Sequence, residues 1–217
     1  MRKAARREAL SRDRILRVAL DIVDHEGLEA VSMRRVGEAL GVEAMSLYNH
    51  VASKAQILDG IFEMVLADLP PAGRSVSWTA ALRGRARALR SALCAHPNAL
   101  PMFATRPAVT PASIAHVETA LDVLRSAGFT ADDALSALQV LVAYVVGHAV
   151  STHAPRKPGD SSIPEYDRLS EEAFPRVREA ARLLPTHNVE KEFELGLNAM
   201  IAGLEVRLGR SQRKAAR

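Results

Sequence analysis

The sequence lacks several features, and each absence excludes some classes of fold or function. Its single cysteine, Cys94, can form no disulfide within the chain, which is typical of a protein in a reducing cytoplasm. No apolar run approaches the ~20 residues of a membrane span. The basic segment Met1 to Leu10 has no apolar stretch behind it, so we expect no secretion signal. No alternating strand pattern occurs, and so no Asn-Gly or Asp-Gly hairpin joins two such strands. Together, these absences lead us to expect an all-α cytoplasmic protein without membrane contact.

Familiar catalytic motifs are missing as well. The sequence contains no His-Glu-x-x-His, no Gly-rich phosphate loop and no Gly-x-Ser-x-Gly. His148 and His153 lie about 140° apart around a helix, so they do not share a face. We therefore expect neither an enzyme nor a cofactor or metal site. Two alternatives stay open at this point: a helical metal-dependent enzyme, and a helical small-molecule sensor or scaffold without DNA binding.

What the sequence does contain is an uneven charge distribution. Its 29 basic and 25 acidic residues give a net charge of +4. Residues 1–17 hold seven basic and two acidic side chains, and residues 205–217 hold five and one, whereas the remaining 18–204 hold 17 and 22. The basic ends are either solvated tails or segments attracted to phosphates.

Apolar spacing and capping residues predict a succession of helices. Serines can cap the helices that begin near residues 11, 32 and 53, and five of the helices are ended by Gly27, Gly41, Pro70, Pro97 and Gly128. The expected helices cover residues 11–27, 32–41, 44–50, 53–69, 80–95, 110–127, 130–153, 165–184 and 189–208, and residues 154–164 are expected to form a loop.

Residues 32–54 have the layout of a helix-turn-helix, because two short helices meet at Gly41. Leu47 and Val51 are one turn apart and must face inward, which leaves Met45 and Tyr48 exposed. Exposed side chains of this kind are costly unless a partner covers them, and the major groove of DNA is such a partner.

The residue types around this motif suit DNA. Met45 can pack on a thymine methyl group, and the Arg34 guanidinium matches the O6 and N7 acceptors of guanine. Polar side chains at the same end suit phosphates. The plain alternative is an ordinary packed helical pair. The candidate DNA-binding residues are Ser32, Met33, Arg34, Ala44, Met45, Ser46, Tyr48, Asn49, His50 and Lys54.

With the stretch from Leu40 to Val51, Lys54 and Leu58-Asp59, residues 10–60 resemble the N-terminal domain of the TetR family of transcriptional repressors. Residues 78–208 are similar, more weakly, to the ligand-sensing domain of tetracycline repressors, through His96, Thr105-Arg106-Pro107, Ala127-Gly128-Phe129, residues 134–138 and residues 192–197. The resemblance implies a base contact for Arg34 and DNA-backbone contacts for Tyr48, His50 and Lys54. It also implies that the helix over 53–69 transmits the ligand signal.

The expected organisation follows from the motif and the resemblance together. We expect a basic arm over 1–10, a helix-turn-helix DNA-binding domain with its connecting helix over 11–69, a helical ligand-binding and dimerisation domain over 78–208, and a basic tail over 209–217. The expected function is that of a homodimeric repressor that binds a palindromic double-stranded DNA operator and is released by a small-molecule effector.

Departures from the family pattern concern both sites. The first recognition-helix residue, a glutamine in tetracycline repressors, is Ala44, and a tryptophan near the helix end is Asn49, so the operator should differ. In the drug site, Met102 replaces the histidine that binds magnesium and Pro70 replaces a second histidine, whereas Thr105 is retained. Further replacements fall at Arg85, Leu89, Ala120 and Ser151. We therefore expect an effector that is not tetracycline.

The expected effector cavity is largely apolar with a few polar groups, the usual form of a small-molecule site. Each candidate taken singly also fits a plain core or surface position. The candidate ligand-binding residues are Arg85, Leu89, Met102, Phe103, Thr105, His116, Val117, Leu135 and Leu138.

Two helices are expected to form the dimer interface. The helix over 130–153 is apolar on more than one stripe and the helix over 189–208 has a long apolar face, so one small domain cannot cover both. Pairing each with its twofold copy gives a four-helix interface, in which Leu197 and Leu204 are expected to lie. The alternative is a monomer in which residues 165–184 cover this surface.

Overall fold

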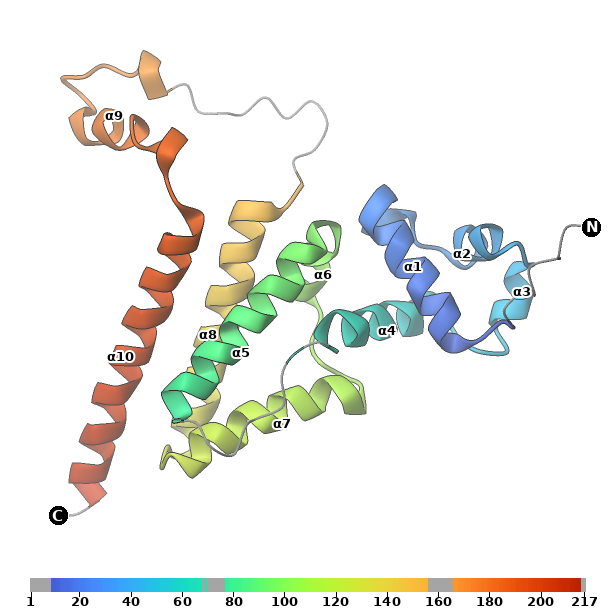
Figure 1. Ribbon diagram of the computed structural model, residues 1–217, viewed down its shortest axis with the longest axis horizontal. Helices are drawn as coiled ribbons and strands as arrows, with labels where there is room; N and C mark the ends of the chain where they lie inside the picture. Colours follow the sequence, from blue (N-terminus) through green and yellow to red (C-terminus); the bar gives the residue numbers. More distant parts are fainter. Residues whose placement is uncertain (1–8, 68, 70–76, 156–165, 216–217) are drawn as a thin grey trace, which may run out of the picture.

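The computed structural model describes residues 9–67, 69, 77–155 and 166–215, and these residues form helices and no strand (Figure 1). The all-α expectation is confirmed. The helices are α1 (Arg12–Glu26), α2 (Met33–Leu40), α3 (Ala44–Leu47), α4 (Lys54–Leu66), α5 (Trp78–Ala95), α6 (Leu100–Thr105), α7 (Pro111–Ser126), α8 (Ala131–His153), α9 (Pro175–Ala181) and α10 (Val189–Ala215), with short 3₁₀ turns at 28–30, 97–99, 166–168 and 184–186. We call α1 to α4 the head and α5 to α10 the body.

The head is a small helical unit at one end of the molecule (Figure 1). Its helices begin where capping predicts, because Ser11, Ser32 and Ser53 each accept a hydrogen bond from the backbone N–H three residues on. The helices close over one apolar core. Its fully or almost fully buried members include Ile15, Ala19, Val23, Val31, Val36, Leu47, Val51, Ile57 and Ile61.

The head joins the body through α1 and α4. The ring of Phe62 on α4 stacks on that of Phe103 on α6, with centroids 4.5 Å apart. Beside this contact, the Arg106 guanidinium donates to the Asp59 carboxylate at 2.6 Å. At the end of α1, the Asp24 carboxylate lies 2.9 Å from the Nδ1 atom of His96. Stacked rings and ion pairs therefore link two helices of the head to the segment 96–106 of the body.

The body is built around α8, which packs against α5, α6, α7 and α10. α8 is long and apolar enough to cross a membrane by length and composition, contrary to expectation. Burial in the body accounts for part of this apolar character, because Ala134, Leu141 and Val145 lie in the core, whereas Leu135, Val140 and Val142 are exposed on the single chain.

α10 runs antiparallel to α5, and three arginines of α5 tie the two helices together. Arg87 donates to both carboxylate oxygens of Glu194 at 2.6 and 2.7 Å, Arg90 binds Glu190, and Arg83 binds Asn198. The hydrogen bonds from Arg87 hold the pKa of Glu194 below its ordinary value. The long last helix is thus docked by polar contacts along its side as well as by its buried face.

Several predicted boundaries are wrong. The connecting helix α4 ends at Leu66, not at Leu69. The helix expected over 165–184 is only α9, because Pro175 has no N–H and disfavours a helical conformation at the residue before it. The recognition helix ends at Leu47, not at His50, and continues as a turn in which the His50 N–H donates to the Leu47 carbonyl. α10 extends to Ala215, so most of the expected basic tail is helical. The expected arm residues 1–8 and loop residues 156–164 lie outside the described residues.

Candidate functional site

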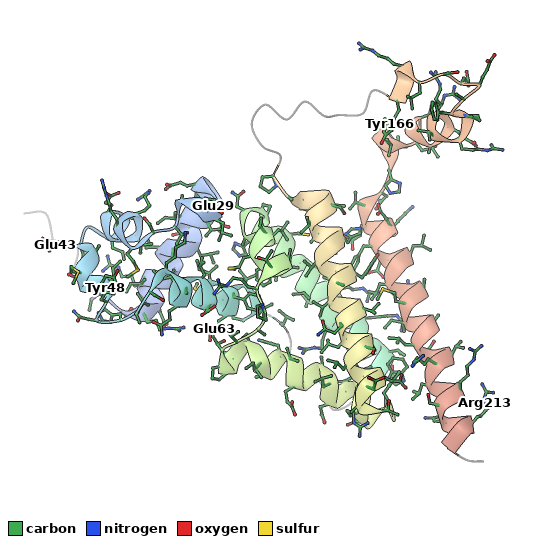
Figure 2. All side chains as sticks on the ribbon, turned by 180° about the vertical axis from the view of Figure 1, so that it is seen from behind. Glu29, Glu43, Tyr48, Glu63, Tyr166 and Arg213 are labelled. Carbon is green, nitrogen blue, oxygen red and sulfur yellow. The ribbon has the colours of Figure 1, made fainter. Side chains whose placement is uncertain are left out.

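The outer surface of α3 carries exposed apolar side chains. Met45 and Tyr48 are 72% and 48% exposed, whereas Leu47 and Val51 are buried in the head. Figure 2 shows Tyr48 at the outermost end of the head, beside Glu43. The predicted inward and outward faces of this helix are therefore confirmed. The side chains of the neighbouring helix α2 bear on what this surface contacts.

Two adjacent arginines of α2 have different surroundings. The Nε atom of Arg34 donates to the Glu38 carboxylate at 2.8 Å, and its side chain is 88% exposed. Arg35 instead makes two hydrogen bonds to the Glu26 carboxylate at the end of α1. Arg35 therefore ties α2 to α1, while the guanidinium of Arg34 projects into solvent.

The other candidate DNA-binding residues surround this surface. The Ser32 hydroxyl is used as the cap of α2, and Met33 is half-buried against the core of the head. Ala44 and Ser46 are half-buried at the recognition helix. The exposed candidates are Asn49, His50 and Lys54.

Gly37 was not singled out from the sequence, although an isolated glycine within a helix is a signal of close approach. A Cβ atom at this position would lie 3.0 Å from the Val42 carbonyl oxygen and 3.2 Å from the Ala44 nitrogen. Both neighbours are backbone atoms of the turn and the recognition helix. Gly37 therefore sets how closely α3 packs on α2.

The candidate effector residues come from α5 to α8 and are only partly brought together. Met102 and Leu138 are buried, and Leu89 and Phe103 are half-buried against the core. Thr105 is exposed, with its hydroxyl donating to the Pro101 carbonyl. In contrast, Val117 and Leu135 are 37% and 49% exposed on the surface of the single chain.

The two polar candidates of this region are in contact. Arg85 is buried, and its guanidinium donates to the His116 carbonyl at 2.9 Å. Burial lowers the pKa of Arg85. Burial and the nearby Arg85 charge lower the pKa of His116, which favours the neutral imidazole. The buried Arg85 guanidinium therefore binds the backbone of α7, and the half-buried imidazole of His116 lies on the same helix.

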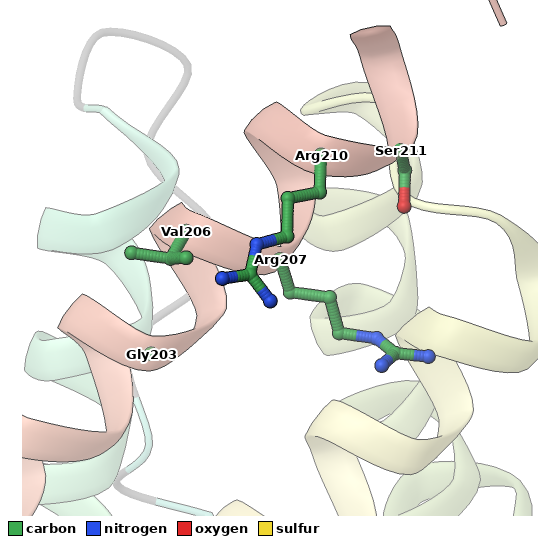
Figure 3. A pocket seen from close by; sticks show the side chains of 5 residues that line it. All are labelled: Gly203, Val206, Arg207, Arg210 and Ser211. Carbon is green, nitrogen blue, oxygen red and sulfur yellow. The ribbon is translucent and has the colours of Figure 1, made fainter. Parts of the chain in front are cut away.

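Two hollows on the body lie at α8 and α10, and none of the candidate effector residues lines either of them. A groove of about 410 Å³ between the two helices is lined by Asp133, Ser136, Ala137, Val140, Met200, Gly203, Leu204 and Arg207. A second hollow of about 420 Å³ lies further along α10 and is lined by Gly203, Val206, Arg207, Arg210 and Ser211 (Figure 3). Arg207 closes one side of the groove by donating to Asp133 at 2.7 Å.

The face of α10 predicted for the dimer needs correction. Leu197 is fully buried against its own chain, together with Phe193 and Ile201, because this face packs on the body. A different stripe of α10 is exposed, at the helical spacing of Leu195, Ala199, Ala202 and Val206. The exposed positions Val140, Ala143 and Gly147 form a matching stripe on α8.

Among the described residues, no group of three or more His, Cys, Asp and Glu side chains could hold a metal ion. His148 lies in the core of the body, and both of its ring nitrogens are buried without a hydrogen-bond partner. Its Nε2 atom lies 3.9 Å from the Glu192 carboxylate, and its ring packs edge-on against Phe193.

A helix-turn-helix head with an exposed recognition helix, joined to a helical body, defines a DNA-binding regulator. A family model described as "Bacterial regulatory proteins, tetR family" matches residues 15–61, and one described as "Tetracyclin repressor-like, C-terminal domain" matches residues 70–208. The chain belongs to the TetR family of transcriptional repressors.

Individual relatives agree with this assignment. The HTH-type transcriptional repressor DrrR1 of Streptomyces coeruleorubidus is 31% identical over 95% of this chain and 82% of its own length. The class A tetracycline repressor from transposon 1721 in Escherichia coli is 32% identical over 89% of each chain. The crystal structure of apo ActR from Streptomyces coelicolor superposes with a TM-score of 0.79 at 28% identity, over 94% of this chain and 99% of ActR. ActR in complex with actinorhodin gives a TM-score of 0.78 at 29% identity.

Proposed function

We propose that this protein is a cytoplasmic, ligand-responsive repressor that binds a palindromic operator as a homodimer and is released by a small, largely apolar effector other than tetracycline. The observation that carries the DNA-binding part is the surface formed by Met45, Tyr48 and Arg34. It presents two exposed apolar side chains and one projecting guanidinium on adjacent short helices. This combination fits thymine methyl groups and guanine acceptors in a major groove.

The homodimer is supported by the exposed stripes of α8 and α10 and by the groove between them. Small residues such as Ala143 and Ala199 allow two helices to approach closely, and a second copy of the same surface would cover both stripes. Two heads related by a twofold axis read two equivalent half-sites, about 34–36 Å apart, and the operator should therefore be a palindrome.

The effector is proposed to bind among α5, α6, α7 and α8. The buried or half-buried Leu89, Met102 and Phe103 supply apolar surface, and Arg85 with His116 supplies polar contacts. ActR, a structural relative, binds actinorhodin. Met102 offers no nitrogen to a magnesium ion, so a tetracycline-magnesium complex lacks the ligand that the family resemblance implies.

The two sites are coupled if the effector favours a spacing of the heads that no longer fits the operator. The coupling is reciprocal, so bound operator weakens the effector by the same factor as the effector weakens the operator. The stacked pair Phe62 and Phe103 joins the connecting helix to the effector region and is the proposed route.

The test begins with selection of duplexes from random DNA by the full chain, followed by a thermal-shift screen for compounds that stabilise it. We expect a near-palindromic site, and release from it by a hit of the screen. Lys54→Ala should weaken all sequences about equally and flatten the salt dependence, as loss of a phosphate contact does. Recovery of no preferred sequence would refute operator binding, and micromolar release by tetracycline with magnesium would refute the effector assignment.

A further inference from the structure

The geometry of α2 points to a specificity-determining residue beside the recognition helix. We propose that Glu38 is a positioning residue for base recognition: its carboxylate holds the guanidinium of Arg34 by one edge, so that the opposite donors face the DNA in a preset orientation. The inference rests on the proposed DNA-binding function and goes beyond it by assigning a role to a carboxylate on the DNA side of the head.

The first step is the chemistry of the contact. A guanidinium has five N–H donors, and guanine accepts two parallel hydrogen bonds at O6 and N7. The Glu38 carboxylate accepts from Nε of Arg34 at 2.8 Å. This bond leaves the donors of Nη1 and Nη2, which form one fork at the end of the side chain. Glu38 thus takes the donor that an end-on contact with guanine does not need.

The second step is the contrast with the neighbouring arginine. Arg35 donates hydrogen bonds from both Nε and Nη2 to the Glu26 carboxylate, and these bonds join α2 to α1. Arg34 and Glu38 are instead 88% and 52% exposed and belong to the same helix, four residues apart. Their ion pair joins no two elements of the fold. Its consequence is the orientation of a long, otherwise mobile side chain.

The third step concerns the sign of the effect. A carboxylate close to DNA repels phosphates, so a role through charge alone predicts tighter binding to every sequence when the charge is removed. Positioning predicts the opposite for the operator, because an unrestrained arginine loses more rotamer freedom when it binds a base. The two roles are therefore separated by the base preference rather than by affinity alone.

The experiment uses the full chain and the operator selected by it. Dissociation constants are measured by fluorescence anisotropy for the operator, for duplexes altered at the base pair that Arg34→Ala identifies, and for a duplex with 7-deazaguanine, which lacks N7, at that pair. The proteins are the wild type, Arg34→Ala, Glu38→Ala and the double variant. Alanine is used because the amide oxygen of glutamine would still accept from Nε of Arg34. Glu29→Ala is the matched control, because Glu29 is exposed on a turn of the head outside α2 and α3.

A two-bond contact with guanine discriminates between bases by roughly 5- to 150-fold. We expect Glu38→Ala to lose at least about threefold of this discrimination at the identified pair alone. The 7-deazaguanine penalty should shrink with it, and Glu38→Ala should have no further effect on preference in the Arg34→Ala background. Glu29→Ala should leave the preference unchanged.

The inference is overturned if Glu38→Ala keeps the full preference and tightens operator and unrelated DNA alike, as the control does. It is also overturned if Arg34→Ala changes no base preference, although operator binding by the chain would then still stand. Failure of the wild-type chain to select any sequence is a different outcome, which refutes the proposed function itself.

Discussion

The head and the α8/α10 side of the body expose apolar side chains in different patterns. In the head, Met45 and Tyr48 are confined to one short helix, and almost every other large apolar side chain is buried or half-buried. In the body, exposed apolar positions run along two long helices, at Val140, Ala143 and Gly147 of α8 and at Leu195, Ala199, Ala202 and Val206 of α10. The small apolar patch of the head, which is surrounded by polar groups, suits a groove of DNA. The two long apolar stripes of the body suit another protein surface. The same residue types, arranged in different patterns, therefore suit two kinds of partner.

The largest expected effect separates the two faces of α10. Leu197→Glu places an unpaired charge in the core and should cost on the order of 4 kcal/mol or more, so the body should unfold. Ala199→Glu, two residues on and exposed, should leave the chain folded but monomeric, with weakened operator binding. Circular dichroism and sedimentation measure both. An intact dimer for Ala199→Glu would place the interface elsewhere, and a folded Leu197→Glu protein would contradict the packing of α10.

An intermediate effect compares one glycine from each region. Gly37→Ala meets only backbone atoms of the recognition turn, so α3 must shift, and operator affinity should fall by about 1–3 kcal/mol. In Gly196→Ala, the new methyl group meets the hydroxyl end of Tyr144, which can rotate but then loses its hydrogen bond to the Phe193 carbonyl. That variant should lose about 1 kcal/mol of stability with operator affinity retained.

Thermal unfolding and anisotropy titrations on both glycine variants check the comparison. If Gly37→Ala bound the operator as the wild type does, the close contact between α2 and α3 would have no role in recognition.

The smallest effect concerns pH and the body alone. Burial and the Arg90 charge lower the pKa of His148, while Glu192 opposes them in part. The folded state therefore binds fewer protons than the unfolded state as the pH falls below the ordinary histidine pKa of about 6.5, and stability declines between about pH 7 and pH 5. His148→Leu should flatten this decline and change stability at pH 7 by no more than about 1 kcal/mol. Urea unfolding at several pH values measures it, and an unchanged pH slope would assign the decline to other groups.

The sequence predicts the head better than the body because the head's signals are local. The capping serines fix where α1, α2 and α4 begin, and glycines mark where α1 and α2 end. The short apolar spacing places Leu47 inward. In the body, the same apolar periodicity does not say which stripe meets its own chain. Leu197 and Leu195 differ by two positions on one helix, and only the docking of α10 on α5 and α8 decides that the first is buried.

The site residues follow the same division. Because Leu47 and Val51 occupy the inward face of one short helix, Met45 and Tyr48 must be exposed, and the sequence alone was enough to predict this. Leu135 and Leu138 were assigned together, yet a rotation of three positions around α8 leaves the first exposed and the second buried. The pair between Arg34 and Glu38 follows the four-residue spacing of a helix, but the choice of Glu26 as the partner of Arg35 depends on the crossing of α1 and α2.

The burial pattern of the recognition helix has an evolutionary consequence. Of its four residues, Leu47 alone belongs to the core, while Ala44, Met45 and Ser46 keep contact with solvent. Substitutions at these three positions therefore cost the fold little. After a gene duplication, one copy could move to a new promoter through a few codon changes, while it inherited the ancestral chemical sensor intact.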